Sequence, residues 1–183
     1  MTTRTWKIDP SHSGIHFTVR HMVFSKVRGS FDSWDGSIEL DEKDPSASKV
    51  SVRIDAASID TREAKRDEHL RSADFFDVKT YPELTFESAS VEKRSDDRYA
   101  VIGDLTIHGT TRRVELDTEL LGTGADPWGN QRIAFQARTS VLRKDFGLGW
   151  NQVLETGGLL VGDQIEITLD VQAVLAQAVE KVA

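Results

Sequence analysis

The sequence has no cysteine among its 183 residues. A chain without thiols forms no disulfide, offers no thiolate nucleophile and builds no zinc site from cysteine ligands. It also lacks any apolar run near the ~18–20 residues that span a bilayer as a helix. The first ten residues, which end at Asp9-Pro10, contain no apolar stretch of the kind found in secretory signal peptides. We therefore expect a cytoplasmic protein, although the lack of cysteine is itself compatible with any compartment.

Basic residues are outnumbered by acidic ones. Lys and Arg together number 23 and Asp and Glu 30, which gives a formal net charge of −7. Because phosphate contacts require a basic face, a net acidic chain with scattered Lys and Arg is a poor candidate for nucleic-acid binding. The same balance argues against electrostatic attachment to anionic lipids. Hydrophobic residues make up 38% and charged residues 29%, which is typical of one globular domain, here residues 1–183.

Motifs of common enzymes are incomplete or missing. The glycine-rich stretch 147–162 lacks the Gly-Lys-Ser/Thr ending and the following helix of a phosphate-binding loop. Ser72 lies three residues after His69, but no Gly-x-Ser-x-Gly elbow surrounds it. Because no nucleophile has a base arranged beside it, we name no catalytic residue and expect no required cofactor.

Long helical patterns are also missing, and an alternation with a period of two takes their place. In the segment from Val114 to Leu120, apolar or neutral residues alternate with acidic ones. Successive side chains on a strand point to opposite faces, so such a segment buries one face and exposes the other to water. The alternation recurs at 15–19, 133–137 and 165–171. A sheet with one apolar face must cover that face, either by closing on itself or by packing on a second sheet.

This rhythm predicts about eight to ten strands joined mostly by short connections, hence an antiparallel all-β domain. We expect the strands at 6–9, 14–23, 27–31, 37–40, 50–56, 84–91, 99–107, 113–121, 131–142 and 163–174. Residues 33–36 are predicted to form a turn, 122–130 a loop, and Gly29 a bend or bulge. One helical insertion, or two short helices, is expected within 61–76, with Thr61 as its N-cap.

Four separated motifs point to one family. They are 8–13 running into 15–22, 66–77 with the following Tyr81-Pro82, 103–111, and 143–151. In these motifs and their order the chain resembles the YceI-like family of lipocalin-like polyisoprenoid-binding proteins, over a core of about 6–173 that leaves 174–183 as a tail. The resemblance implies an eight-stranded antiparallel barrel with a long apolar cavity. Many members of the family carry a signal peptide and are periplasmic, which differs from the expectation above.

A polyisoprenoid tail has no polar group, so its pocket must be apolar along its length. The apolar strand faces supply ten candidate wall residues: Phe17, Val19, Val52, Ile54, Phe86, Leu105, Val114, Leu116, Phe135 and Ile167. Taken singly, each is better explained as an ordinary core residue, since apolar strand faces usually form the core. The cavity itself is implied by the family resemblance and not by the periodicity.

A polar headgroup needs one or two partners at the end of such a cavity. His21 shares a strand face with Ile15 and Phe17, so it should point inward near the strand end. There its imidazole could meet a quinone carbonyl or a phosphate, or it could be a core histidine bonded to the backbone. Arg143 and Asp145 could line the mouth or form an ordinary ion pair. The remaining two candidates at the mouth are Phe146 and Trp150.

The helical insertion is interpreted as a lid. Leu70, Phe75 and Phe76 would cover the barrel edge, with the charged side chains outside, and Asp67 and Arg71 would form an i,i+4 surface pair.

The histidines do not form a predicted metal site. On a strand His12 and His16 share one face and His21 takes the other, so the three are not ligands of one ion. His69 lies near Asp67 and Asp74 in the insertion, and we expect no metal there.

The leading hypothesis is a non-enzymatic carrier or storage protein for a long-chain polyisoprenoid or isoprenoid quinone. Its partner would be a small amphiphilic lipid, which should copurify with it, and the family resemblance suggests a possible homodimer. One alternative is an enzyme that acts on a lipid or quinone in the same barrel, with His21 as its acid–base group. Another is a stress-response or assembly module whose surface matters more than its interior.

Overall fold

The computed structural model describes residues 3–176 of the chain, which form eleven strands, one α-helix and four 3-10 turns. The strands are β1 (Thr3–Ile8), β2 (Gly14–His21), β3 (Ser25–Phe31), β4 (Trp34–Asp41), β5 (Lys49–Asp55), β6 (Ile59–Asp60), β7 (Glu83–Lys93), β8 (Arg98–Ile107), β9 (Thr110–Ala125), β10 (Gln131–Leu142) and β11 (Val161–Leu175). The helix is α1 (Ala64–Arg71). Within this part of the chain, no helix is long and apolar enough to cross a membrane.

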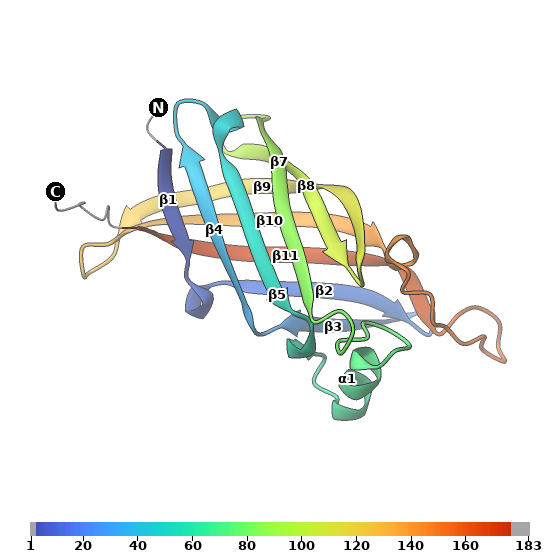
Figure 1. Ribbon diagram of the computed structural model, residues 1–183. Helices are drawn as coiled ribbons and strands as arrows, with labels where there is room; N and C mark the ends of the chain where they lie inside the picture. Colours follow the sequence, from blue (N-terminus) through green and yellow to red (C-terminus); the bar gives the residue numbers. More distant parts are fainter. Residues whose placement is uncertain (1–2, 177–183) are drawn as a thin grey trace.

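Eight of the strands close into an antiparallel ring, in the order β1-β4-β5-β7-β8-β9-β10-β11 and back to β1 (Figure 1). The seam that closes the ring is short, because β1 meets β11 through three residue pairs, from Trp6–Leu175 to Ile8–Ala173. The other junctions are longer, and β10 pairs with β11 over most of its length. The predicted all-β, eight-stranded antiparallel barrel with one helical insertion is therefore confirmed.

One edge of β11 serves two strands in succession. Its residues 161–170 pair with β2, and its last residues pair with β1. Between these strands the 3-10 turn η1 (Pro10–His12) bends the chain out of line. The Ser13 hydroxyl donates to the carbonyl of Gln172 and accepts from its amide, at 3.2 and 2.9 Å. This side chain continues the ladder across the bend, so the wall stays closed where the backbone leaves it.

The two ends of the barrel differ. We call the end that carries the β1–β11 seam and the turn at 126–130 the narrow end. We call the end that carries the β2–β3 hairpin, α1 and the loop 147–160 the wide end. At the wide end β3 pairs with β2 along its length and with the short β6 through two residue pairs. Helix α1 lies below β3 at this end (Figure 1), so the helical insertion covers a gap that the strands leave.

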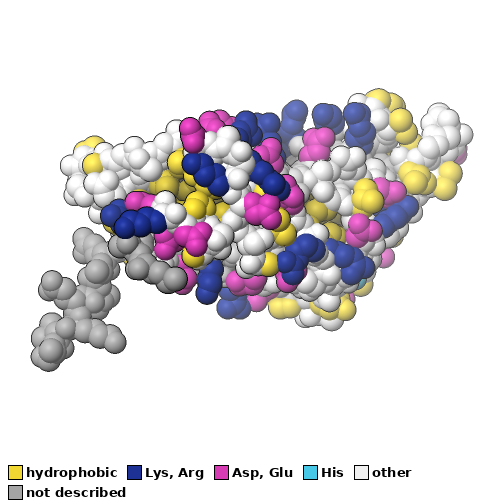
Figure 2. Space-filling view, turned by 90° about the horizontal axis from the view of Figure 1, so that it is seen from above, with side chains coloured by type: hydrophobic (Ala, Val, Ile, Leu, Met, Phe, Trp, Pro, Cys, Tyr) yellow, Lys and Arg dark blue, Asp and Glu magenta, His cyan; other side chains and the backbone are white. Residues whose placement is uncertain are grey.

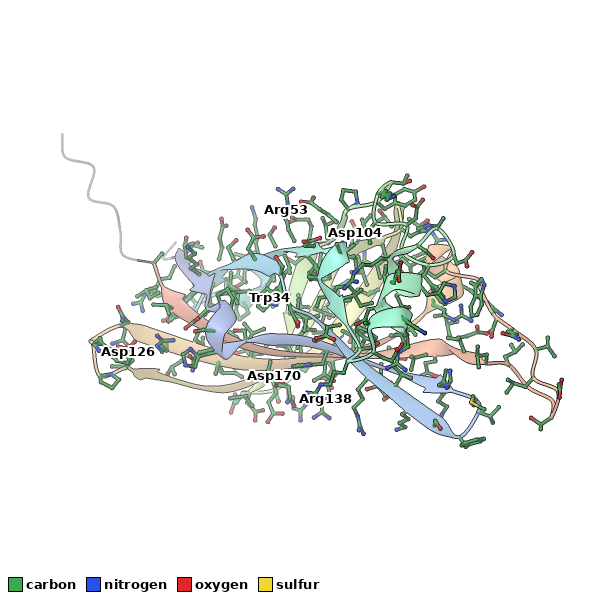
Figure 3. All side chains as sticks on the ribbon, turned by 90° about the horizontal axis from the view of Figure 1, so that it is seen from below. Trp34, Arg53, Asp104, Asp126, Arg138 and Asp170 are labelled. Atoms are coloured by element: carbon green, nitrogen blue, oxygen red, sulfur yellow. The ribbon has the colours of Figure 1, made fainter. Side chains whose placement is uncertain are left out.

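Apolar side chains line the interior in two connected clusters. The larger cluster reaches the wide end and includes Phe31, Phe86 and Phe146. The smaller cluster lies at the narrow end around Trp6 and Ile133. Trp34 and Val50 pack against both clusters and join them. Charged side chains such as those of Arg138 and Asp170 lie on the outer face of β10 and β11 (Figure 3), as the alternation predicts.

Three local predictions are wrong. Residues 34–36 belong to β4 and not to a turn, because the Trp34 side chain is held between the two clusters. The predicted loop at 122–130 is shorter, since β9 continues to Ala125 after a bulge at Leu121. Gly29 forms no bulge either, because β2 and β3 pair in unbroken register through it.

The helix and the tail also depart from the expected bounds. Helix α1 spans Ala64–Arg71, and its N-cap is Glu63 instead of the predicted Thr61. The Glu63 carboxylate accepts from the Arg66 amide at 2.6 Å. Strand β11 continues through Leu175, two residues beyond the predicted core. The rest of the predicted tail, from 177 to 183, lies outside the described residues.

A chain of charges holds the narrow end together. Asp126 accepts from the amides of Trp128 and Asn130 and from Arg132 Nε, while Arg132 Nη1 reaches Asp9 at 2.9 Å. The Asn130 side chain and the Arg132 guanidinium hold the pKa of Asp126 well below its usual range. The Ser11 hydroxyl and Arg132 do the same for the pKa of Asp9. These bonds tie the turn at 126–130 to η1 across the seam.

Asp9 and Asp126 have depressed pKa values in the folded state. Their ionised carboxylates therefore stabilise the fold fully above the unfolded pKa of ~4, and this stabilisation is lost as the pH falls from there through the folded pKa. Asp126→Asn removes the charge and should lower the melting temperature at neutral pH. It should also make the melting temperature fall less steeply between neutral pH and strongly acidic pH.

Thermal unfolding followed by circular dichroism across this pH range measures both effects. Asp104→Asn is the matched control, because its ion pair with Arg113 is exposed and it lies away from Asp126 (Figure 3). An Asp126→Asn profile parallel to that of the unmodified protein would contradict the role of this carboxylate.

Candidate functional site

The ring encloses a cavity of about 280 Å³. Along β10 its lining runs from Ile133 to Val141, which corresponds to about 26 Å of strand at ~3.3 Å per residue. Along β11 it runs from Val161 near the wide end to Val171 near the narrow end. The space is therefore elongated along the barrel and is bordered by most of the strands.

The ten residues predicted for the wall all lie on it. Phe17, Val19, Val52, Ile54, Phe86, Leu105, Val114, Leu116, Phe135 and Ile167 line the cavity. The period-two pattern placed them on the inner face, because the strands that carry them keep their regular alternation. The lining also includes residues that the prediction did not name, among them Val141, Leu148 and Leu169.

The first predicted wall residue has a specific seat. Phe17 faces Gly29 across the β2–β3 pair. A methyl group added at Gly29 would lie 2.3 Å from the Phe17 ring, so only glycine lets the ring lie flat against β3. From there the ring meets Phe31 at 5.7 Å between centroids, and Phe31 meets Phe76 of the insertion at 5.8 Å. This row of aromatic rings connects the barrel wall to the lid.

The cavity lining is mostly apolar. Among the described residues no Asp, Glu or Lys lines it, and its polar members are His16, Ser48, Tyr99, Thr118, Thr139 and Arg143. The Ser48 hydroxyl accepts from the Asp41 amide, and the Thr118 hydroxyl donates to the Leu116 carbonyl. A polar guest would lose its hydration and gain few hydrogen bonds, which is costly, whereas an apolar chain loses nothing. The lining therefore suits an elongated apolar molecule better than a polar one.

The predicted lid residues lie over the wide end of the cavity. Leu70, Phe75 and Phe76 all line it, and Phe75 is buried. Phe75 also packs against Trp150 at 5.3 Å between centroids, and His69 meets the same indole edge to face at 4.7 Å. Trp150, predicted at the mouth, thus covers the lid from outside and does not itself line the cavity.

The charges of the insertion are not arranged as predicted. Asp67 is buried instead of exposed, and its carboxylate accepts from the Thr61 amide and hydroxyl, at 2.9 and 2.5 Å. Arg71 does not pair with it, because the guanidinium donates to the carbonyls of Ala57 and Ile59. Both side chains therefore anchor α1 to the segment that precedes it, which fixes the lid on the barrel.

Arg143 fills the mouth with hydrogen bonds to the backbone. Its side chain is 3% exposed. It donates to the carbonyls of Leu148 at 2.7 Å, Trp150 at 2.8 Å and Gly162 at 2.9 Å. Burial lowers the pKa of this guanidinium, and the charge of Asp163, 3.4 Å away, raises it. The guanidinium donors of Arg143 thus hold the loop that begins at 147 against the start of β11.

The other predicted mouth residues separate. Phe146 is 1% exposed and lines the cavity. Asp145 is exposed, and the predicted alternative of an Arg143–Asp145 ion pair is wrong, since Arg143 pairs with Asp163. The reason is that 143–146 form a 3-10 turn, η4, which points the two side chains in different directions.

His21 does not border the cavity. It ends β2 and keeps the inward-facing register that the sequence predicts, opposite Ser25 and Val161. Val161 lines the cavity and His21 does not, so the imidazole lies one step beyond the lining, at the rim of the wide end. Among the described residues no hydrogen bond or ion pair joins His21 to another side chain.

Two other histidines contact a nearby carboxylate, whereas His16 is among the cavity-lining residues. His12 Nδ1 lies 2.9 Å from Asp9, and His69 Nε2 lies 2.9 Å from Asp74. Asp67 is bonded to Thr61 and not to His69. Within residues 3–176 no group of three or more His, Asp or Glu side chains is placed to hold a metal ion.

Comparison with known proteins gives one consistent family. A model described as the YceI-like domain matches residues 6–173. The chain is 44% identical over 145 residues to Protein YceI of Escherichia coli O17:K52:H18, an alignment that covers 78% of this chain and 75% of that protein. It is 47% identical over 137 residues to UPF0312 protein ECA1782 of Pectobacterium atrosepticum, with 75% and 71% covered.

Solved structures share the barrel. The YceI protein of Campylobacter jejuni is 31% identical and superposes with a TM-score of 0.74 over 86% of this chain and 90% of its own. BcnA of Burkholderia cenocepacia, 24% identical, reaches 0.80 over 90% and 98%. A polyisoprenoid binding domain from Saccharophagus degradans, 16% identical, reaches 0.69 over 93% and 98%. At these identities the last two establish likeness of fold.

Arg143→Lys tests the hydrogen bonds from Arg143 to the carbonyls at the mouth, which we call the clamp. Lysine keeps the charge, but its single nitrogen cannot reach all the carbonyls that Nε and Nη1 of Arg143 contact, so the free energy of unfolding should fall by roughly 2 to 4 kcal/mol. Hydrogen exchange should rise most in 148–162. Chemical denaturation and exchange mass spectrometry measure the two effects. Arg138→Lys, on the exposed face of β10, is the control and should change neither; equal behaviour of the two variants would refute the clamp.

Proposed function

This chain belongs to the YceI-like family, and on that premise we propose that it binds a long-chain polyisoprenoid or isoprenoid quinone in its barrel and acts as a carrier or storage protein. The observation that carries the proposal is the elongated cavity with an almost wholly apolar lining. Such a cavity gains affinity from area removed from water, at ~25 cal/mol per Å² before the cost of ordering the chain.

The solved neighbours support the ligand class. One structure with the same fold is described as a polyisoprenoid binding domain. An isoprenoid tail is flexible, branched and free of polar groups, so it is the kind of guest that a narrow space lined by Phe17, Phe135 and Ile167 favours. The homodimer that the family resemblance suggests stays a prediction. The cytoplasmic location also stays a prediction.

The ends of the barrel suggest an orientation for the ligand. In this proposal the tail lies toward the narrow end, where the β1–β11 seam closes the ring. The headgroup lies at the wide end, beside His21 and below the lid formed by Leu70, Phe75 and Phe76. Arg143 positions the rim in this arrangement and does not contact the headgroup, because its donors are already bonded to carbonyls.

The carrier role is favoured over the enzymatic alternative by the surroundings of His21. General acid–base catalysis needs titratable groups within hydrogen-bond reach of the reacting atoms. His21 stands at the rim without a titratable partner among the described residues, and the cavity itself carries no free carboxylate or amine there. A bound quinone would therefore be held without being transformed.

Organic extraction of the natively purified protein, followed by mass spectrometry, tests the proposal directly. A prenyl lipid or prenyl quinone should be recovered in an amount comparable to the protein. Incubation of the emptied protein with a prenyl quinone should return the quinone chemically unchanged. Folded protein that repeatedly yields no lipid would count against binding, and a new product after incubation would favour the enzyme.

Ala137→Trp tests where the ligand lies. Ala137 is 7% exposed and lines the middle of the cavity on β10, so an indole there occupies space that the tail needs. Lipid recovered by extraction should fall about tenfold or more, since burial of the tail supplies the affinity. Ala134→Trp is the matched control, because Ala134 lies on the same strand and outside the lining. Undiminished lipid in a folded Ala137→Trp variant would mean that the ligand binds elsewhere.

A further inference from the structure

The wide end of the barrel carries an exposed apolar projection. We call Met22, Val23 and Phe24 the tip, because they join β2 to β3 at the end of the hairpin. Phe24 is 80% exposed and Val23 58%. Hydrophobic side chains gather at this end of the molecule in the space-filling view, while charges of both signs cover the barrel (Figure 2). An apolar projection of this kind is typical of a binding surface.

The tip holds its conformation at a cost. Met22 and Val23 both have positive φ, 52° and 69°, a region that a branched residue such as Val adopts rarely. The Phe24 amide bonds to the Met22 carbonyl at 2.8 Å, around Val23. A three-residue turn with positive φ at its centre is the rare, strained form. Asn-Gly would make a relaxed hairpin, so this sequence keeps apolar side chains where a polar turn would be easier.

A second loop extends the same surface. Residues 153 and 159 of the loop 147–160 pair with each other, and Val153 is 75% exposed. The loop packs on the tip, because a methyl group added at Gly158 would lie 2.9 Å from the Val23 side chain. The Met22 amide also donates to the Leu160 carbonyl at 2.8 Å. The hairpin and the loop lie together beyond the barrel (Figure 1).

The charge of the β2–β3 hairpin is opposite in sign to that of the whole chain. From 14 to 31 the sequence contains Arg20, Lys26 and Arg28 and no Asp or Glu, although the chain as a whole has a net charge of −7. Arg20 stands directly opposite Lys26 on the outer face, two pairs along the ladder from Arg28. All three are exposed and make no ion pair with another described residue. Like charges placed opposite each other repel, so they call for an anionic partner.

The opposite end does not share this combination. Trp128 is 81% exposed there, but its turn is held by the carboxylates of Asp126 and, through Arg132, Asp9. The apolar tip also adjoins the mouth, because Val161, which lines the cavity, pairs with His21 immediately before Met22. The exposed apolar tip and three cations without an ion pair among the described residues thus lie on one hairpin, at the end where the cavity is covered by the lid.

We propose that the wide end docks on anionic phospholipid bilayers. Phe24 and Val153 enter the acyl boundary, and Arg20, Lys26 and Arg28 meet lipid phosphates. Docking would place the mouth against the membrane, so an isoprenoid could pass between the bilayer and the cavity without crossing water. The purpose of docking rests on the proposed function, whereas docking itself rests on the tip and its charges. The loop 147–160 adds one acidic residue, Glu155.

Cosedimentation with vesicles tests the proposal. The probes are vesicles of phosphatidylcholine alone and of phosphatidylcholine with an equal amount of phosphatidylglycerol. The unmodified protein should bind the mixed vesicles more tightly, and added salt should weaken this binding. Phe24→Ser with Val153→Ser should weaken it about tenfold or more, because two exposed apolar anchors are lost. Trp128→Ser is the matched control and should leave binding unchanged.

A charge variant and a lipid assay complete the test. Lys26→Gln with Arg28→Gln should remove the preference for phosphatidylglycerol. The lipid recovered by extraction should be the same in the tip variant as in the unmodified protein, since neither substituted residue lines the cavity. Vesicle binding without any extracted lipid would refute the carrier function and leave docking intact. Docking is refuted if the unmodified protein binds neither vesicle. It is also refuted if the Phe24 and Val153 changes leave vesicle binding unaltered, including the case in which they convert a dimer to a monomer.

Discussion

The structure depends on one geometric constraint: a ring of eight strands encloses more volume than its own inward side chains fill. Every second side chain of a barrel strand points into this interior, so these inward positions must be apolar. The ring is sealed by only three residue pairs between β1 and β11. The Ser13–Gln172 bonds and the Asp9–Arg132–Asp126 chain reinforce this seam from outside. These few polar contacts lie where the wall closes around the apolar interior.

Polar groups elsewhere serve the same end. Arg143 and Asp67 are buried, and each is satisfied by backbone groups or by a neighbouring hydroxyl. Their bonds fix the loop and the helix that cover the wide end, which the strands leave open where β3 diverges from the ring. A buried charge that is fully bonded in this way positions a loop without offering a partner to a guest. The mouth is thus shaped by polar residues and lined by apolar ones.

The inward face of each strand could be predicted from the sequence, because a period of two is local. Phe17 and Phe135 follow this rule, and so do the other predicted wall residues. The partner of Arg143 could not be predicted, since Asp163 is distant in sequence and Asp145 is near. Asp67 looked like a surface residue for the same reason: its bond to Thr61 depends on how the helix turns back on the preceding strand. Residues 22 and 23 of the tip fall within the strand predicted at 14–23, because apolar residues at a strand end do not reveal that they lie outside the barrel.

A crystal structure of the natively purified protein would show whether the barrel holds a ligand. We expect continuous tubular electron density between β10 and the opposite wall, running from the lid toward the narrow end and matched by no protein atom. Phe17 should lie over Gly29 and leave that space free. A barrel whose aromatic side chains have collapsed inward, with no density between them, would mean that there is no ligand cavity.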